Sequence, residues 1–170
     1  MTFRELAGKT IGIIGMGTIG SKVARIASAF GMDVVYYSTS GTGHCREYPS
    51  LPIEELLARA DIVSIHAPLN DRTRGLIGAD RLRMMKQDAI LINMGRGGIV
   101  DEAALAEAVD EGYIAGAGLD VFVKEPLPAD HPLLGMKHPE RVVLTPHVGW
   151  ASAEARERLI AAIGANIASL

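Results

Sequence analysis

The sequence predicts an α/β domain with a doubly wound parallel sheet of six or more strands and a C-terminal helix. Short apolar runs alternate along the 170 residues with segments of helical periodicity, as strands alternate with crossover helices. The apolar runs lack a polar–apolar alternation, which is typical of parallel strands buried on both faces. A glycine-rich stretch joins the first run to the first helical segment, as in many doubly wound sheets.

Six apolar runs are the expected strands. They cover residues 10–15, 34–37, 62–67, 89–94, 115–122 and 141–146. Each has a length usual for a strand, and the intervening segments are long enough for helices. We therefore expect a sheet with helices on both faces.

Helical segments connect these strands. In the first, one apolar helical face is expected, and Gly31 is the expected end; the face is formed by Ile19, Val23, Ile26, Ala27 and Phe30. Further helices are expected at 53–60, 78–86, 101–112 and 152–170. The charged "EARER" stretch of the last segment is most simply a solvated face.

Composition predicts one globular domain over residues 1–170. Hydrophobic residues make up 48% and charged residues 22%, which disfavours disorder. The formal net charge is −3 and the basic residues are scattered, so nucleic acid and anionic membrane are not expected partners. The single Cys45 fits a reducing compartment, and residues 1–10 lack a signal-peptide pattern, so we expect a cytoplasmic location.

Gly15, Gly17 and Gly20 form a G-x-G-x-x-G pattern between the first strand and the first helix. In this context the first glycine allows a tight turn, the second lets a pyrophosphate approach, and the third packs helix on sheet. Free N–H groups at the helix start then bind the phosphates. The pattern predicts a dinucleotide site in a Rossmann-like fold, although with 19 glycines a merely structural turn is the alternative.

The residue expected to read the adenosine ribose is Ser38, which stands 18 residues after Gly20 where an acid is usual. Asp33 cannot replace it, because it opens the second strand about 16 Å away. Ser38 and Thr39 can bond a ribose hydroxyl without repelling a 2′-phosphate, and the nearest cation in sequence is Arg46. NAD and NADP are both possible, with a modest preference for NAD.

Three polar residues follow successive strands: Arg96 the fourth, Glu125 the fifth and His147 the sixth. The carboxyl ends of parallel strands meet at one edge, where ligands bind, so these side chains are expected to converge. Taken singly, a surface cation, a solvated carboxylate and a loop histidine are the simpler interpretations.

These residues stand in five motifs that resemble the coenzyme domain of the D-isomer-specific 2-hydroxyacid dehydrogenases. The motifs are "ELAGKTIGIIGMGTIG", "ADIVSIHAPLNDRTRGLI", "ILINMGRGGIVDEAAL", "GAGLDVFVKEPLP" and "LTPHVGW". Arg96 and Glu125 are 29 residues apart and Glu125 and His147 are 22 apart, which fits the family's order. The resemblance extends over nearly the whole chain.

The resemblance implies roles for the three polar residues. Arg96 would clamp the substrate carboxylate and polarise the neighbouring keto oxygen. His147 would donate a proton to that oxygen as hydride arrives, and remove it in the reverse direction. Glu125 would fix the imidazole tautomer and favour its protonated form.

The resemblance also implies contacts with the cofactor. Asp120 would hold the nicotinamide carboxamide, and the backbone at Thr18 and Ile19 would meet the pyrophosphate. Further residues of the cofactor site would be Pro68, Thr73, Met94 and Gly149, together with Arg96 and His147. His66 is either a packing residue or a lining of this site. We assign no metal site, and no role to His44, His131 or His138.

Family members are about twice as long as this chain, so the resemblance implies a coenzyme domain whose substrate domain lies outside residues 1–170. It also implies a homodimer formed through this domain and a small 2-keto or 2-hydroxy acid as substrate. "YYSTSG" favours hydroxypyruvate or glyoxylate. The isolated domain is expected to be inactive. The alternative function is an NAD-sensing interaction module of the transcriptional corepressor type.

Overall fold

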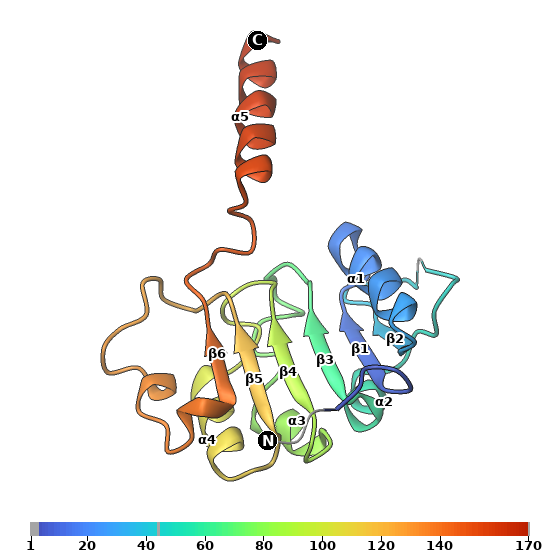
Figure 1. Ribbon diagram of the computed structural model, residues 1–170, viewed down its shortest axis with the longest axis vertical. Coiled ribbons are helices and arrows are strands. Elements are labelled where there is room, and N and C mark those ends of the chain that lie inside the picture. Colours follow the sequence, from blue (N-terminus) through green and yellow to red (C-terminus); the bar gives the residue numbers. More distant parts are fainter. Residues whose placement is uncertain (1–3, 44, 170) are drawn as a thin grey trace.

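The computed structural model describes residues 4–43 and 45–169 and shows a parallel six-stranded sheet (Figure 1). The strands are β1 (Thr10–Ile14), β2 (Asp33–Tyr37), β3 (Ile62–Ile65), β4 (Ile90–Asn93), β5 (Gly116–Leu119) and β6 (Val142–Leu144). Their spatial order is β2-β1-β3-β4-β5-β6, and all neighbouring pairs are parallel. The chain runs from β1 outward to β2 and then crosses to β3, which confirms a doubly wound, Rossmann-like sheet with its switch point between β1 and β3.

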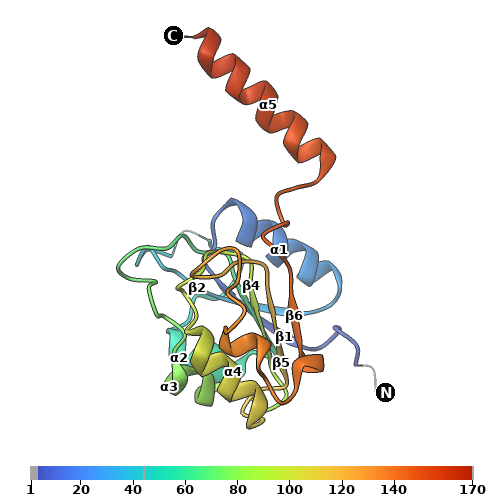
Figure 2. The ribbon, with the colours of Figure 1, turned by 90° about the vertical axis from the view of Figure 1, so that its left-hand side faces the viewer.

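Helices cover the two faces of the sheet unequally (Figure 2). On one face α1 (Thr18–Ala29) packs on β1 and β2. On the other lie α2 (Ile53–Arg59), α3 (Ala79–Met84) and α4 (Glu102–Asp110). Two short 3-10 helices, η1 (Pro132–Leu134) and η2 (Pro139–Arg141), stand between β5 and β6 in the chain, and α5 (Ala153–Ala168) follows β6.

The larger hydrophobic core lies between the sheet and α2, α3 and α4. Its fully buried side chains include Leu56, Leu57, Val63, Ile65, Leu82, Leu91, Leu105 and Val109. A smaller core under α1 contains Ile11, Ile13, Ala24, Ala27 and Val34. Burial of each large apolar side chain contributes roughly 1.5–3 kcal/mol, so the larger core is the main source of stability.

The prediction that helices cover both faces is wrong for β4, β5 and β6. On the α1 side of these strands lies an apolar groove of about 430 Å³, lined by Ile90, Ile92 and Val143 around the glycines of β5. Val143 is 66% exposed and Ile90 41%. Apolar runs indicate strands suited to burial, but they do not show which strands a helix reaches, and α1 packs only at the β1–β2 end.

The C-terminal helix α5 extends away from the sheet (Figure 1). Ser152 caps it by accepting a hydrogen bond from the Ala155 N–H at 3.2 Å. None of the residues Ala153–Ala168 is buried, so the solvated face predicted for this helix includes its apolar residues as well. Among the helices of residues 4–43 and 45–169, none has the length and apolar character needed to cross a bilayer.

Candidate active site

The loop from β1 to α1 contains the three glycines, and their surroundings differ. Gly15 has φ +93°, and a Cβ there would lie 3.0 Å from the backbone of His66 and Ala67. A Cβ at Gly20 would lie 2.1 Å from the carbonyl oxygen of Gly15, so α1 can approach this closely only with glycine. At Gly17 a Cβ would meet nothing within 4 Å, which leaves open space for a ligand.

The N-terminus of α1 suits an anion. Gly17 occupies the N-cap, no described side chain caps it, and the first turn contains no acidic residue. The first-turn N–H groups, at Thr18, Ile19 and Gly20, lack intrahelical acceptors. Because the helix dipole adds positive potential at this end, the loop fits a dinucleotide pyrophosphate.

The loop after β2 is held together by hydroxyl groups and by a distant arginine. The Ser38 hydroxyl donates to the Thr42 carbonyl at 2.6 Å and lies 3.1 Å from Ser40 Oγ. Arg72, from the segment between β3 and α3, donates from Nη1 to the Ser40 carbonyl at 3.0 Å. Arg46 is the nearest cation in sequence, but the fold brings Arg72 to this loop.

Arg96 is fixed by the turn that follows β4. The buried Asn93 accepts a hydrogen bond from the Gly95 N–H and donates to the Arg96 carbonyl, both at 3.0 Å. Arg96 Nη1 donates to the Gly95 carbonyl at 2.8 Å. A Cβ at Gly97 would lie 2.0 Å from the carbonyl of Phe122, so this turn packs directly on the segment after β5.

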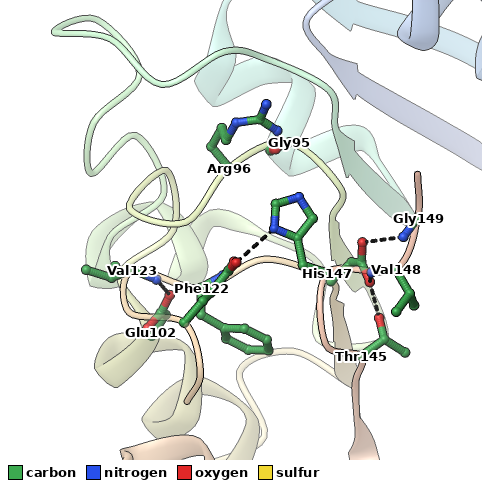
Figure 3. A network of polar contacts seen from close by, with 11 residues as sticks. Gly95, Arg96, Glu102, Phe122, Val123, Thr145, His147, Val148 and Gly149 are labelled. Atoms are coloured by element: carbon green, nitrogen blue, oxygen red, sulfur yellow. Dashed lines mark hydrogen bonds and ion pairs between the residues drawn. The ribbon is translucent and has the colours of Figure 1, made fainter. Parts of the chain in front are cut away.

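Asp120, at the end of β5, anchors the loop that follows β6, whose Thr145, Val148 and Gly149 are labelled in Figure 3. Its carboxylate accepts hydrogen bonds from the Thr145 hydroxyl at 2.5 Å and from the N–H groups of Val148 and Gly149 at 2.9 and 2.8 Å. Burial raises the pKa of Asp120, but these hydrogen bonds outweigh it and hold the pKa below its usual range. The anchored turn includes His147.

His147 pairs with Glu125. Its Nδ1 lies 2.8 Å from one carboxylate oxygen of Glu125, and the other oxygen accepts the Phe122 N–H at 2.9 Å. The Phe122 hydrogen bond, followed by that from His147, lowers the pKa of Glu125. His147 itself has φ 54°, in the left-handed region that residues other than glycine seldom adopt.

This pairing determines which imidazole nitrogen is available for chemistry. An ionised carboxylate can only accept, so Nδ1 of His147 carries a hydrogen and Nε2 is left to exchange a proton with a ligand. Figure 3 shows the imidazole of His147 directed toward the turn that carries Arg96. An imidazole and a guanidinium therefore lie on neighbouring loops. Their roles as proton donor and carboxylate-binding group stay predictions.

A second carboxylate–imidazole pair lies beside this site. Glu102, at the start of α4, accepts the Val123 N–H at 2.8 Å, and its other oxygen lies 2.8 Å from Nε2 of His131. Nδ1 of His131 accepts the Leu133 N–H at 3.3 Å, so Nε2 carries the hydrogen that bonds Glu102. The pair ties α4 to the segment that carries Glu125.

The other predicted cofactor residues occupy different environments. Thr73 is 0% exposed, and its hydroxyl donates to the Pro68 carbonyl at 2.7 Å, so it shapes its turn and presents no surface to a ligand. Met94 and Gly149 lie side by side, since a Cβ on Gly149 would stand 2.8 Å from the Met94 methyl group. Thr39 is half-buried beside Ser38. Thr73 therefore has no exposed surface for direct contact, whereas contact between Met94, Gly149 or Thr39 and a cofactor stays a prediction.

The remaining histidines differ in burial. His66 donates its backbone N–H to the Ile14 carbonyl, and its ring lies 2.9 Å from the Ser64 hydroxyl. Its Nδ1 is buried without a hydrogen-bond partner among the described residues, and burial lowers the pKa of this imidazole. His138 pairs with Glu140 at the surface, and His44 lies outside the described residues.

Comparison with known proteins agrees with this geometry. Residues 1–149 match the family described as "D-isomer specific 2-hydroxyacid dehydrogenase, NAD binding domain". The chain belongs to this family.

Similar proteins include a glyoxylate reductase from Aeropyrum pernix, which is 51% identical over 168 residues, covering 96% of this chain and 49% of the relative. A solved acyclic imino acid reductase in complex with NADPH and D-Arg is 39% identical, with a TM-score of 0.85 over 98% of this chain and 53% of the other. A D-lactate dehydrogenase from Lactobacillus jensenii, solved with NAD+, is 39% identical, with a TM-score of 0.80. The match covers 89% of this chain and 49% of the dehydrogenase. The chain thus spans about half the length of the relatives that it matches.

This NAD-binding domain also contains functional candidates that the sequence did not indicate. Asn93 shapes the Arg96 turn, Glu102 and His131 hold the Glu125 segment, and Arg72 reaches the loop after β2. Asn93 ends an apolar run, Glu102 stands in a first helical turn where acids are common, and His131 precedes a proline. None of these local patterns signals a contact across the fold, so only the structure brings out the four residues.

Proposed function

We propose that this chain is the coenzyme domain of an oxidoreductase that transfers hydride between a nicotinamide dinucleotide and a small 2-keto or D-2-hydroxy acid. The observation that carries the proposal is the His147–Glu125 pair on loops adjoining the Arg96 turn, at the carboxyl edge of β4, β5 and β6. An acid/base and a guanidinium at one edge suit a substrate that carries a carboxylate next to a carbonyl, because the guanidinium can bind the carboxylate and the acid/base can exchange a proton with the carbonyl oxygen.

In reduction, the bound nicotinamide supplies hydride to the keto carbon. Arg96 binds the substrate carboxylate and polarises the keto oxygen, a task for which its planar fork is better suited than lysine. Nε2 of protonated His147 gives its proton to that oxygen, and the Glu125 carboxylate stabilises the imidazolium before the transfer. In oxidation, neutral His147 removes the hydroxyl proton through the same nitrogen.

The domain's own residues would hold the cofactor. The first-turn N–H groups of α1 bind the pyrophosphate, and Ser38 and Thr39 lie at the end of β2, where a ribose is read. Asp120 keeps the 145–149 loop in place and is also the residue proposed to face the nicotinamide carboxamide. Met94, Pro68 and Gly149 complete the proposed lining.

The relatives described above are named as reductases and dehydrogenases, which supports an enzyme over the corepressor-type alternative. Glyoxylate or hydroxypyruvate is the proposed substrate, in keeping with the glyoxylate reductase from Aeropyrum pernix. We further propose that the substrate domain lies outside residues 1–170, that the domain forms a homodimer, and that it is cytoplasmic.

The proposal is tested by joining this chain to the substrate domain of the Aeropyrum reductase and assaying four keto acids. We expect NAD(P)H-dependent reduction of glyoxylate or hydroxypyruvate to exceed that of pyruvate and phosphohydroxypyruvate. A chimaera that binds NADH but reduces none of the four would count against the proposed activity, because cofactor binding shows that the domain is folded.

A further inference from the structure

The loop after β2 is an uncharged ribose-binding segment with one cation placed against it from elsewhere in the fold. Residues 38–42 read Ser-Thr-Ser-Gly-Thr and contain no charged side chain. The guanidinium of Arg72 reaches this loop across 32 residues of sequence and bonds the Ser40 carbonyl at 3.0 Å. Gly41 lies beside this contact and has φ +80°, a backbone conformation that favours glycine.

The backbone that carries Arg72 is ordered. Its N–H donates to Asn70 Oδ1 at 2.9 Å, and the buried Thr73 hydroxyl accepts the Asn70 N–H at 2.9 Å while donating to the Pro68 carbonyl. The turn therefore directs the Arg72 side chain toward the loop after β2. Asn70 and Thr73 both act in shaping this turn.

Arg72 retains most of its binding capacity. A guanidinium has five N–H donors, and the bond to Ser40 uses one of them. The side chain is exposed and forms no ion pair with a carboxylate among the described residues. A positive charge with free donors, standing against an uncharged loop, is suited to a phosphate monoester, which it can bond through two oxygens.

We infer that Arg72 binds the 2′-phosphate of NADP(H), so that this domain accepts the phosphorylated dinucleotide at least as well as NAD(H). The inference rests on the dinucleotide site of the proposed function and adds the residue that determines cofactor selectivity. It revises the modest preference for NAD predicted from sequence, because that prediction considered only cations close to Ser38 along the chain.

The test compares ligands that differ by one phosphate, using the 170-residue chain and calorimetric titration. The probes are adenosine 2′,5′-bisphosphate against adenosine 5′-monophosphate, and NADPH against NADH. Arg72→Gln removes the charge while keeping a polar side chain at this position. Arg74→Gln is the matched control, since it removes the same charge from the same turn, whereas the hydrogen bond to the Ser40 carbonyl comes from Arg72.

We expect Arg72→Gln to weaken the bisphosphate and NADPH by about tenfold or more, as for loss of a charge-assisted hydrogen bond. Affinity for the monophosphate and NADH should stay within about twofold, and Arg74→Gln should alter neither pair beyond the small effect of a screened surface charge. Raising the salt concentration should weaken the bisphosphate more than the monophosphate in the wild-type chain.

Three results would overturn the inference: a wild-type chain that binds NADH but not NADPH, equal losses for both members of each pair in Arg72→Gln, or equal effects of Arg72→Gln and Arg74→Gln. Each of these leaves the proposed dehydrogenase site intact. Failure of the folded wild-type chain to bind any dinucleotide would instead overturn the proposed function itself.

Discussion

His147 combines a rare backbone conformation with a defined tautomer. Its φ of 54° is held by the hydrogen bonds that Asp120 accepts from Val148 and Gly149, just beyond it in the chain. Residues in sparsely populated backbone regions persist where their surroundings determine them, and they are frequent in active sites. The conformation orients the imidazole so that Nδ1 meets Glu125, which leaves Nε2 for a substrate.

Replacing His147 by Asn is the direct test of its role, because Asn tolerates a left-handed backbone and can still donate to Glu125. In the chimaera, we expect the kcat for reduction to fall by roughly 10²–10⁴-fold, since the amide cannot transfer a proton. NADH affinity should be preserved, which a fluorescence titration checks. A variant that retains near-normal kcat would exclude His147 as the acid/base.

Glu125→Gln should displace the pH profile while leaving the loop in place. The pKa of Glu125 is lowered, first by the Phe122 N–H and then by His147. The ionised carboxylate therefore stabilises the folded state fully above the ordinary pKa of a glutamate, and this stabilisation is lost as the pH falls through the lowered pKa. Across the range in which imidazole ordinarily titrates, about pH 5–8, the Glu125 carboxylate therefore keeps its negative charge.

A neutral amide stabilises imidazolium less than a carboxylate does. Because oxidation needs neutral His147, the acid limb of its pH–rate profile should move to lower pH in Glu125→Gln, and the alkaline limb for reduction should move the same way. Steady-state rates of the chimaera between pH 4 and 10, roughly the span of these titrations, measure both limbs. Unshifted limbs would mean that Glu125 only shapes the loop.

At the scale of elements, local patterns predict the strands well and the contacts between loops poorly. Each predicted strand overlaps an observed one to within a few residues at its ends, because apolar runs and their boundaries are local properties. The fifth run, 115–122, ends as a strand at Leu119; the next residue, Asp120, still donates its N–H to the Asn93 carbonyl, and its side chain accepts the bonds of the 145–149 loop. The order of Arg96, Glu125 and His147 also predicts their convergence, because parallel strands end at one edge.

The Glu102–His131 pair illustrates what such patterns miss. Its partners are 29 residues apart, and the contact depends on how the segment after β5 folds back over the start of α4. Glu102 is only 9% exposed, so its carboxylate must be paired. The histidine and the Val123 N–H provide these partners, and together they fix the backbone next to Glu125.

Glu102→Ala should therefore destabilise the domain. It removes the acceptor of the Val123 N–H and of the largely buried His131 imidazole, which we expect to cost about 1–3 kcal/mol in the free energy of unfolding. Urea denaturation followed by circular dichroism measures this. Glu107→Ala, an exposed position on the same helix, is the control and should have little effect. Equal stability of the two variants would show that the buried pair is not a structural clamp.

At the scale of the whole molecule, the unequal cover of the sheet exposes apolar surface. The groove beside Val143 and Ile90 lies on one face, and α5 presents Leu159, Ile160 and Ile163 to solvent. Exposed apolar areas of this kind mark surfaces that bind other protein. Sequence periodicity could not predict this exposure, because a strand buried within the chain and a strand with an exposed apolar face have the same apolar pattern.

We expect the 170-residue chain to self-associate through these surfaces at micromolar concentration. Hydrophobic association buries the exposed area, so Val143→Ser should reduce the assembly without unfolding the larger core on the opposite face. Light scattering with size-exclusion chromatography measures the mass, and circular dichroism checks the fold. A wild-type chain that remains monomeric would refute the proposed homodimer.

The chain should also fold and bind dinucleotide without catalysing turnover. Folding is expected because the large core under α2, α3 and α4 is complete within residues 4–169, and binding because the glycine loop and Arg72 lie in the same chain. Turnover should fail because Arg96 is exposed and the side chains of His147 and Glu125 are each 37% exposed. In open solvent a carboxylate is held weakly and proton transfer is poorly aligned. A hydroxypyruvate assay on the dinucleotide-loaded chain, beside the chimaera, decides the matter: rates equal to those of the chimaera would show that no second domain is needed.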